Sequence, residues 1–230
     1  MRARDVMTAP VLTVRPDTKI ADIARLLIDK HISAAPVVDD AGYIVGIVSE
    51  GDLLRRAEIG TEKRRPWWLE MLTSPDLLAN EYVKSHGLVA SEIMTKEVVT
   101  VKEDTPIQEI ADLLEAHRIK RVPVVKRRKV VGIVSRANLL QGLAVHGSPK
   151  PGRTAETDQS LRDAVMKTIN RQPWAGGAVY NVLVTKRVVH LWGFVRSTEE
   201  RQAMIVAAEN VPGVKDVEDH LSIAHHATGI

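Results

Sequence analysis

Apolar residues near the start of the chain alternate between the spacing of a strand and the spacing of a helix. A short β-type run, 11–14, precedes Pro16-Asp17-Thr18, which is a helix-start signal. Apolar residues then fall on one helical face from Ile20 to about Lys30. Two further runs, 37–39 and 44–48, flank a turn and predict a β-hairpin, after which a second helix is expected to begin at Ser49.

The same order of elements, β, α, β, β, α, returns between about residues 98 and 142. Residues 3–38 align with residues 90–125 at a constant offset of 87, and 17 of the 36 pairs are identical. After a one-residue slip, VGIVSEGDLL from Val45 matches VGIVSRANLL from Val131. An internal repeat predicts two copies of one supersecondary unit, each with an apolar face to bury. We therefore expect an α/β (α+β) fold in which two βαββα repeats form a pseudo-twofold sandwich, with the functional site between them.

An insert, 57–88, separates the two repeats. Pro66 suits the first turn of a helix, and Gly87 suits its end. Trp67 and Trp68 are expected to pack over the sandwich or at a subunit contact, with docking on a partner or a membrane surface as the alternative.

A composition break follows Leu143. The segment 143–157 contains Pro and Gly and no apolar periodicity, which predicts an exposed linker. A second small domain is expected over 158–226. Its apolar pattern predicts an αββαβ unit with a hairpin of 178–185 and 188–195, a helix over 198–210 and a last strand over 214–223. Trp174, Trp192 and Phe194 are expected in the core of this domain.

Composition narrows the function classes. The 230 residues are 44% hydrophobic and 27% charged, as in globular domains. A net charge of +3 makes no strong electrostatic case for nucleic acid, and the absence of cysteine excludes disulfides and thiolate metal sites. We see no export signal and no apolar stretch of membrane-spanning length, so we expect a cytoplasmic protein.

Catalytic motifs are missing from the sequence. It contains no Cys nucleophile, no GxSxG, no Walker loop, no HExxH and no glycine fingerprint. Histidines cluster at positions 220, 225 and 226, but we predict no metal site there. The sequence indicates a regulatory module and not an enzyme.

Several motifs occur twice and in the same order. Each copy opens with Met-Thr, begins a strand with xPV (Ala35-Pro36-Val37 and Val122-Pro123-Val124) and closes with GIVSxxD/N. In this the chain resembles a tandem pair of cystathionine-beta-synthase (CBS) domains, the Bateman module, over about 3–142. The stretch 159–224, with LWGFVRSTEER and VPGVKDVEDHL, is similar to a BON domain, although it lacks the usual Asp-Gly turn before the second hairpin strand. The expected limits are 1–56 and 89–142 for the CBS repeats and 158–226 for the BON-like domain.

The residues Ser49-Glu50-Gly51-Asp52 have two interpretations. By themselves they form a capping box, which is a structural device. The same helix end can also bind an anion while the carboxylate accepts ribose hydroxyls. The resemblance favours the second interpretation, because in CBS pairs the matching Ser/Thr and Asp contact a nucleotide. The nucleotide-binding residues that it implies are Thr13, Ser33, Ala35, Ser49, Asp52, Thr100, Lys120, Arg121, Ser135 and Asn138.

The two implied sites differ. The first has Asp52 but the uncharged Ser33, whereas the second has Lys120 and Arg121 but Asn138 in place of the carboxylate. We therefore expect unequal affinities, with Asp52 essential to one site, because an amide lacks the charge assistance of a carboxylate.

The leading expectation is a homodimeric sensor of AMP, ADP, ATP or S-adenosylmethionine that controls an unidentified protein partner. One alternative is an envelope-associated protein that meets anionic lipid through its BON-like domain. A distant one is a nucleic-acid binder that uses the basic turn Lys126-Arg127-Arg128-Lys129, which is more simply a solvated turn.

Overall fold

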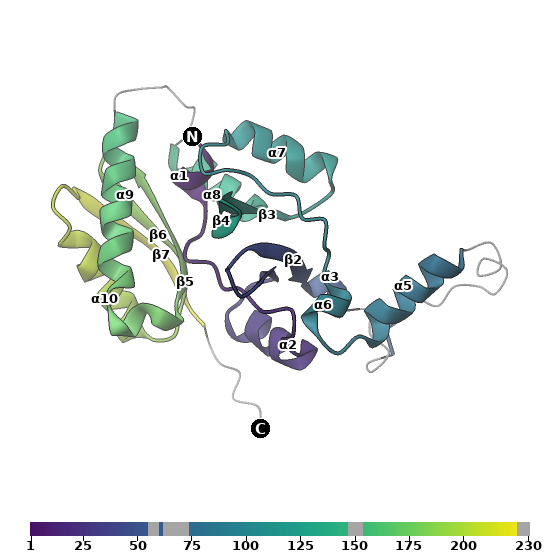
Figure 1. Cartoon of the computed structure of the whole chain (residues 1–230). Coiled ribbons are helices and arrows are strands. Elements are labelled where there is room, and N and C mark those ends of the chain that lie inside the picture. The colour runs from purple at the N-terminus through teal and green to yellow at the C-terminus, as the bar shows by residue number, and fades with distance from the viewer. Residues whose placement is uncertain (55–59, 62–73, 147–153, 225–230) are drawn as a thin grey trace. The chain divides into compact units, whose positions relative to one another are not determined.

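The computed structural model describes residues 1–54, 60–61, 74–146 and 154–224 (Figure 1). The described chain forms two compact units. One unit contains residues 12–98 and 128–130, and the other contains 1–11, 99–127 and the residues from 131 onward.

The unit around residues 12–98 contains the first hairpin and its flanking helices. Its elements are α2 (Ile20–Asp29), β1 (Ala34–Val38), β2 (Ile44–Ser49), α3 (Glu50–Leu53), α5 (Pro75–His86) and α6 (Ala90–Ile93). Strands β1 and β2 are antiparallel, and the apolar face of α2 buries Ile23 and Leu27. The predicted helix and hairpin are thus confirmed. In the predicted strand 11–14, all of which is described, Val14 alone forms a bridge, to Val37.

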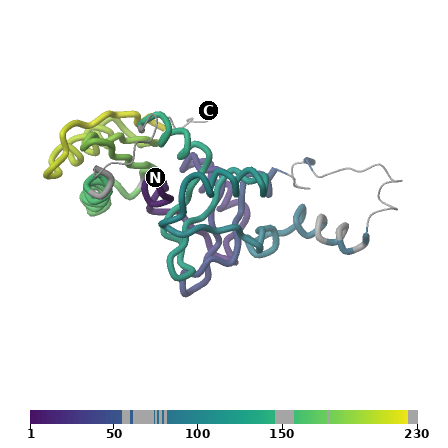
Figure 2. The backbone as a smooth tube through the Cα atoms, turned by 90° about the horizontal axis from the view of Figure 1, so that it is seen from above, coloured from purple at the N-terminus to yellow at the C-terminus, as the bar shows by residue number. Residues whose placement is uncertain are grey.

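Helix α5 belongs to the predicted insert. In both views it extends away from the β1-β2 sheet of its own unit (Figures 1 and 2). It ends at His86, directly before Gly87, as the sequence predicts. The other predictions for this insert, a helix start at Pro66 and the packing of Trp67 and Trp68, lie outside the described residues. No helix among the described residues has the length and apolar character needed to cross a bilayer.

The second hairpin belongs to the other unit, apart from its tip. The elements here are α1 (Ala3–Val6), α7 (Ile107–Ala116), β3 (Arg121–Lys126), β4 (Lys129–Ser135) and α8 (Arg136–His146). Arg127 and Arg128 both have positive φ, 50° and 68°. Two such residues in succession are typical of the tight turn that joins antiparallel strands.

The opening segment of each repeat packs with the hairpin of the other repeat. Thr8 bridges to Ile133, and a Cβ atom added at Gly132 would overlap the Sδ atom of Met7. The same arrangement recurs with Thr95 opposite Ile47 and Met94 over Gly46. The two glycines of the repeated VGIVS motif therefore leave room for the two methionines of the Met-Thr openings. Each Met-Thr opening thus packs on the hairpin of the other repeat. The limits 1–56 and 89–142 follow the sequence repeat and not this packing.

The C-terminal domain is a three-stranded sheet with two helices. Its elements are α9 (Thr154–Asn170), η2 (Pro173–Gly177), β5 (Val179–Thr185), β6 (Val188–Val195), α10 (Thr198–Glu209) and β7 (Asp216–Ile223). Strand β6 lies in the middle, antiparallel to β5 and parallel to β7. Helix α10 provides the crossover that a parallel pair requires. The predicted αββαβ order is confirmed.

The predicted linker is longer than the gap that the structure leaves between helices. Helix α8 continues to His146 and α9 begins at Thr154, so both helices extend into 143–157. The prediction relied on Gly and Pro residues that begin at Gly147, and no helix-breaking residue stands between Leu143 and His146.

Candidate nucleotide sites at the ends of the two hairpins

Asp52 is held at the end of β2 by the serine that precedes its helix. The Ser49 backbone N–H and the Ser49 hydroxyl both donate to Asp52 Oδ2, each at 2.8 Å. Both bonds reach the same carboxylate oxygen, and neither uses Oδ1. The capping interpretation of this motif is therefore correct for its local structure. It also fixes the direction of a half-buried carboxylate.

Three other predicted residues lie close to this hairpin end. The Glu50 N–H donates to the Ser33 carbonyl at 3.1 Å, which holds Ser33 beside the start of α3. Ala35 follows on β1 and is fully buried. Thr13 is exposed and stands next to Val14, whose N–H donates to the Pro36 carbonyl at 3.0 Å. The fold thus places all five predicted residues of the first site around the adjoining ends of β1 and β2.

The second hairpin repeats this backbone geometry. The Arg136 N–H donates to the Lys120 carbonyl at 3.1 Å, and the Val101 N–H donates to the Pro123 carbonyl at 3.0 Å. Thr100 and Lys120 therefore occupy the positions of Thr13 and Ser33, and Arg121 begins β3. Lys120 is exposed, so this hairpin end carries a cation that the first one lacks.

Asn138 repeats the contacts of Asp52 and adds two more. Its Oδ1 accepts the Ser135 N–H at 2.8 Å and the Ser135 hydroxyl at 2.7 Å. Its Nδ2 donates to Thr8 Oγ1 at 3.1 Å and to Gln141 Oε1 at 3.4 Å. A carboxylate could not donate these last two bonds. Asn138 is only 5% exposed, and its amide ties the first turn of α8 to the end of β4 and to Thr8 of the N-terminal segment.

The hydrogen bonds continue from Gln141 into the C-terminal domain. Asn181 of β5 donates through Nδ2 to Gln141 Oε1 at 3.2 Å and to the Val6 carbonyl at 3.0 Å. On the same sheet face, Leu183 is fully buried in the apolar cluster of α7, β3 and β4. The sequence pattern did not predict this contact. One sequence feature could have indicated it. Asn181 and Leu183, a polar and an apolar residue, lie on the face of β5 that is not directed at α9.

A buried arginine supports the same contact. Arg162 of α9 is 4% exposed and donates from Nε to the Val182 carbonyl at 2.7 Å and from its terminal nitrogen to the Met7 carbonyl at 2.8 Å. Burial lowers the pKa of this guanidinium, and the nearby carboxylates of Asp163 and Asp5 partly oppose that shift. The guanidinium of Arg162 stays charged at any accessible pH, and two backbone carbonyls accept its hydrogen bonds.

The predicted core position of Phe194 is wrong, because this side chain is 41% exposed. Val189 and Leu191 point to the helix-covered face of β6, so residues at even positions point to the other face. Trp192 lies on that other face and packs against the cluster that contains Leu183. Trp174 packs against the helix-covered core, as expected.

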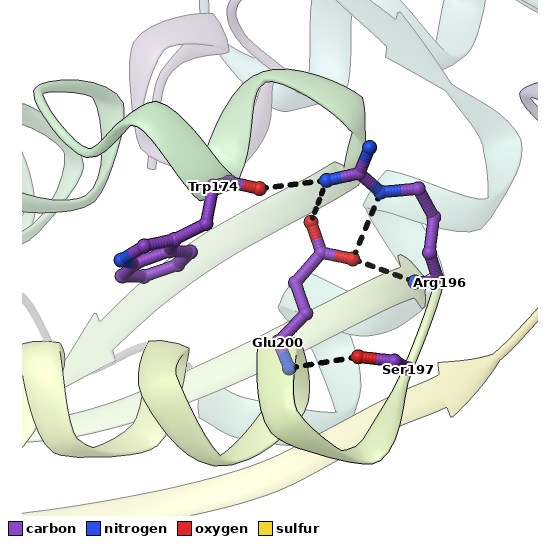
Figure 3. Close-up of polar contacts among 4 residues, drawn as sticks. All are labelled: Trp174, Arg196, Ser197 and Glu200. Carbon is purple, nitrogen blue, oxygen red and sulfur yellow. Dashed lines mark hydrogen bonds and ion pairs between the residues drawn. The ribbon is translucent and has the colours of Figure 1, made fainter.

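A surface hollow of about 490 Å³ lies at the start of α10, lined by Trp174, Arg196, Ser197, Glu199, Glu200 and Ala203. Figure 3 shows that Arg196 and Glu200 bind each other: the Arg196 guanidinium donates to both oxygens of Glu200 and to the Trp174 carbonyl. This hydrogen-bonded pairing raises the pKa of Arg196. Ser197 accepts the Glu200 N–H at 3.1 Å as the cap of α10. These contacts brace the corner between β6 and α10.

Family comparisons agree with this architecture. The CBS domain model matches residues 3–58 and 90–145, and the BON domain model matches residues 157–225. Neither model describes a catalytic domain.

Individual relatives share the CBS part. The uncharacterized protein MJ1426 of Methanocaldococcus jannaschii is 31% identical over 154 residues, which are 62% of this chain and 91% of that protein. The chloroplastic CBS domain-containing protein CBSX2 of Arabidopsis thaliana is 30% identical over 138 residues, which are 56% of each protein. The crystal structure of CBSX2 in complex with AMP is similar, with a TM-score of 0.56 and 28% identity over 64% of this chain and 99% of that one. The chain is therefore a member of the CBS-domain family, with two CBS domains followed by a BON domain.

Proposed function

We propose that this protein is a non-catalytic sensor that binds an adenine nucleotide or a related adenosyl ligand and transmits the binding to its BON domain. The observation that carries the proposal is the duplicated Ser-x-x-Asp/Asn geometry, in which Ser49 orients Asp52 as Ser135 orients Asn138. The complex of CBSX2 with AMP supports an adenosyl ligand for this domain class.

Asp52 is the proposed ribose acceptor of the stronger site. Its Oδ2 is used by Ser49, which leaves Oδ1 on an oriented carboxylate. A carboxylate accepts hydrogen bonds from hydroxyls more strongly than an amide does. Thr13, Ser33 and the backbone at Ala35 would line the same site.

The second site is proposed to favour the phosphate part of a ligand. Lys120 and Arg121 supply positive charge beside Thr100 and Ser135. Both polar atoms of Asn138 already have partners within the chain, so a ribose would have to displace one of them. Unequal affinities of the two sites follow from this difference.

The proposed route of the signal is the hydrogen-bonded chain from Asn138 through Gln141 to Asn181. A ligand that draws on Ser135 or Asn138 changes the contacts that hold Gln141, and Gln141 contacts β5 of the BON domain. A ligand shifts a conformational equilibrium only by its difference in affinity for the two states. The typical scale of such coupling is about 1 to 3 kcal/mol.

The test is thermal unfolding of the full chain with AMP, ADP, ATP or S-adenosylmethionine, followed by calorimetric titration. A true ligand should stabilise the fold by about 2.7 kcal/mol at a hundredfold excess over its Kd. Asp52→Asn should weaken its binding about tenfold, which is about 1.4 kcal/mol. The native pair Ser135 and Asn138 shows that Asn is compatible with this geometry. Asp29→Asn, an exposed carboxamide exchange on α2, is the matched control.

The proposal fails if none of these compounds alters the melting temperature. The assignment of Asp52 fails separately if a ligand binds equally well to the Asp52→Asn variant. A cytoplasmic location, a homodimer and a regulated protein partner remain parts of the proposal.

The lipid and nucleic-acid alternatives are weakened by contacts of the basic residues. At the tip of the BON hairpin, Lys186 and Arg187 would together add only about 2 kcal/mol at an anionic surface, and the negative charge of Asp158, which accepts both of their backbone N–H groups, opposes this attraction. In the basic turn, Lys126 pairs with Glu103 at 2.8 Å. Arg128 and Lys129 lie 5.5 and 5.8 Å from the Tyr43 ring centre. Liposome co-sedimentation and salt-dependent gel shifts would detect either activity.

A further inference from the structure

Strands β6 and β7 carry three side chains of types that can bind metal ions on one face of the BON sheet. In the parallel register His190 is opposite Glu218, and Trp192 is opposite His220. Val189 and Leu191 point to the helix-covered face. Because successive residues of a strand alternate between faces, His190 and its neighbours Glu218 and His220 point to the other face.

The potential ligand atoms of these three residues converge. His190 Nδ1 lies 3.2 Å from Glu218 Oε2, and His220 Nε2 lies 3.6 Å from the same oxygen. All three ligand atoms lie within 4.8 Å of one another. Zinc bonds to nitrogen and oxygen of about 2.0 to 2.2 Å place two ligands of a tetrahedral ion about 3.4 Å apart. The two distances to Glu218 therefore match the edges of a tetrahedral site.

Ring packing fixes the orientation of the two histidine side chains. His220 stacks on Trp192 with ring centres 3.9 Å apart and an angle of 13° between the planes. The His190 ring is nearly parallel to His220, at 6.0 Å and 9°, and its side chain is only 9% exposed. Groups that fix the orientation of ligand rings strengthen metal binding. Glu218, at 54% exposure, leaves the cluster open to solvent on one side.

We propose that this face of the BON domain binds one Zn²⁺ ion through His190, Glu218 and His220. Two imidazoles and one carboxylate suit zinc and neighbouring first-row ions, whereas Ca²⁺ and Mg²⁺ prefer oxygen ligands alone. A water molecule would complete the tetrahedron. The ion would link β6 to β7. No local spacing predicts this site, because His190 is 28 positions from Glu218 and the parallel register brings them together.

The test is calorimetric titration of the chelator-treated full chain with ZnCl₂, with CoCl₂ absorption spectra as a report on coordination geometry. We expect one Zn²⁺ per chain and the intense visible absorption of four-coordinate Co²⁺. Glu218→Gln, which keeps the size of the side chain, and His220→Ala should each weaken Zn²⁺ binding by at least about tenfold. Two controls should bind as the parent does: His117→Ala, which removes an exposed histidine outside the BON domain, and the double variant His225→Ala/His226→Ala.

Thermal melts without metal separate a binding defect from misfolding, since Glu218→Gln is expected to keep the melting temperature of the parent. The proposal is wrong if Zn²⁺ fails to bind the parent at a one-to-one ratio. It is also wrong if the Glu218→Gln/His220→Ala double variant binds as the parent does, or if the His225→Ala/His226→Ala variant abolishes binding. The proximity of Glu218 to the two histidines would then have no role in metal binding.

Discussion

Replacing Arg162 by Met is expected to destabilise the unit that contains the BON domain by about 3 kcal/mol. Two bonds from a charged donor to the Val182 and Met7 carbonyls are each worth about 1.5 to 3 kcal/mol. Burial of the guanidinium, which lowers its pKa, offsets part of that sum. Met has a similar length but no donor, so both carbonyls would lose their partner.

The assay is urea unfolding of the full chain, read as the change in midpoint at constant slope. Lys167→Met is the matched control, because it removes a positive charge from an exposed site on the same helix. That control should change stability by less than about 0.5 kcal/mol. A loss below about 1 kcal/mol in Arg162→Met, or a loss equal to that of the control, would refute the view that Arg162 joins the domains.

Three further predictions concern the BON domain. Gly193→Ala should cost at least about 3 kcal/mol in thermal unfolding, because φ is +138° and the new Cβ would lie 2.6 Å from the Tyr180 Cα. Burial raises the pKa of Tyr180 to about 12, against about 10 in the unfolded chain. Since the unfolded state loses this proton first, stability should be unaffected below about pH 10 and fall by about 2 kcal/mol up to pH 12, and Tyr180→Phe should remove most of that fall in urea melts. Asn181→Leu should leave nucleotide affinity within about twofold of the parent but abolish ligand-induced changes in hydrogen exchange of β5, and unchanged exchange effects would contradict the proposed route.

The sequence was sufficient for elements whose apolar pattern is local. The hairpins of both repeats and the αββαβ order were predicted because strand alternation and helix periodicity are encoded within each segment. The capping geometry of Ser49 and Asp52 was predicted for the same reason, since its partners are three residues apart.

Contacts between distant segments could not be predicted in this way. The opening of one repeat packs on Gly132 of the other, and no local pattern distinguishes that partner from Gly46. The donor role of Asn138 depends on Thr8, which is 130 residues away. Alternation along β6 predicted one apolar face. It did not show that the other face packs against the CBS part near Trp192 and leaves Phe194 exposed.

The exchanged openings make the two CBS copies interdependent. A fragment cut at the boundaries of either sequence copy would lack the methionine that covers its own VGIVS glycine, and would carry one whose glycine is missing. Each copy therefore depends on the other for part of its packing. Loss of either copy would leave one methionine without its glycine and one glycine uncovered in the other copy, so we expect each copy to be less stable alone than in the pair.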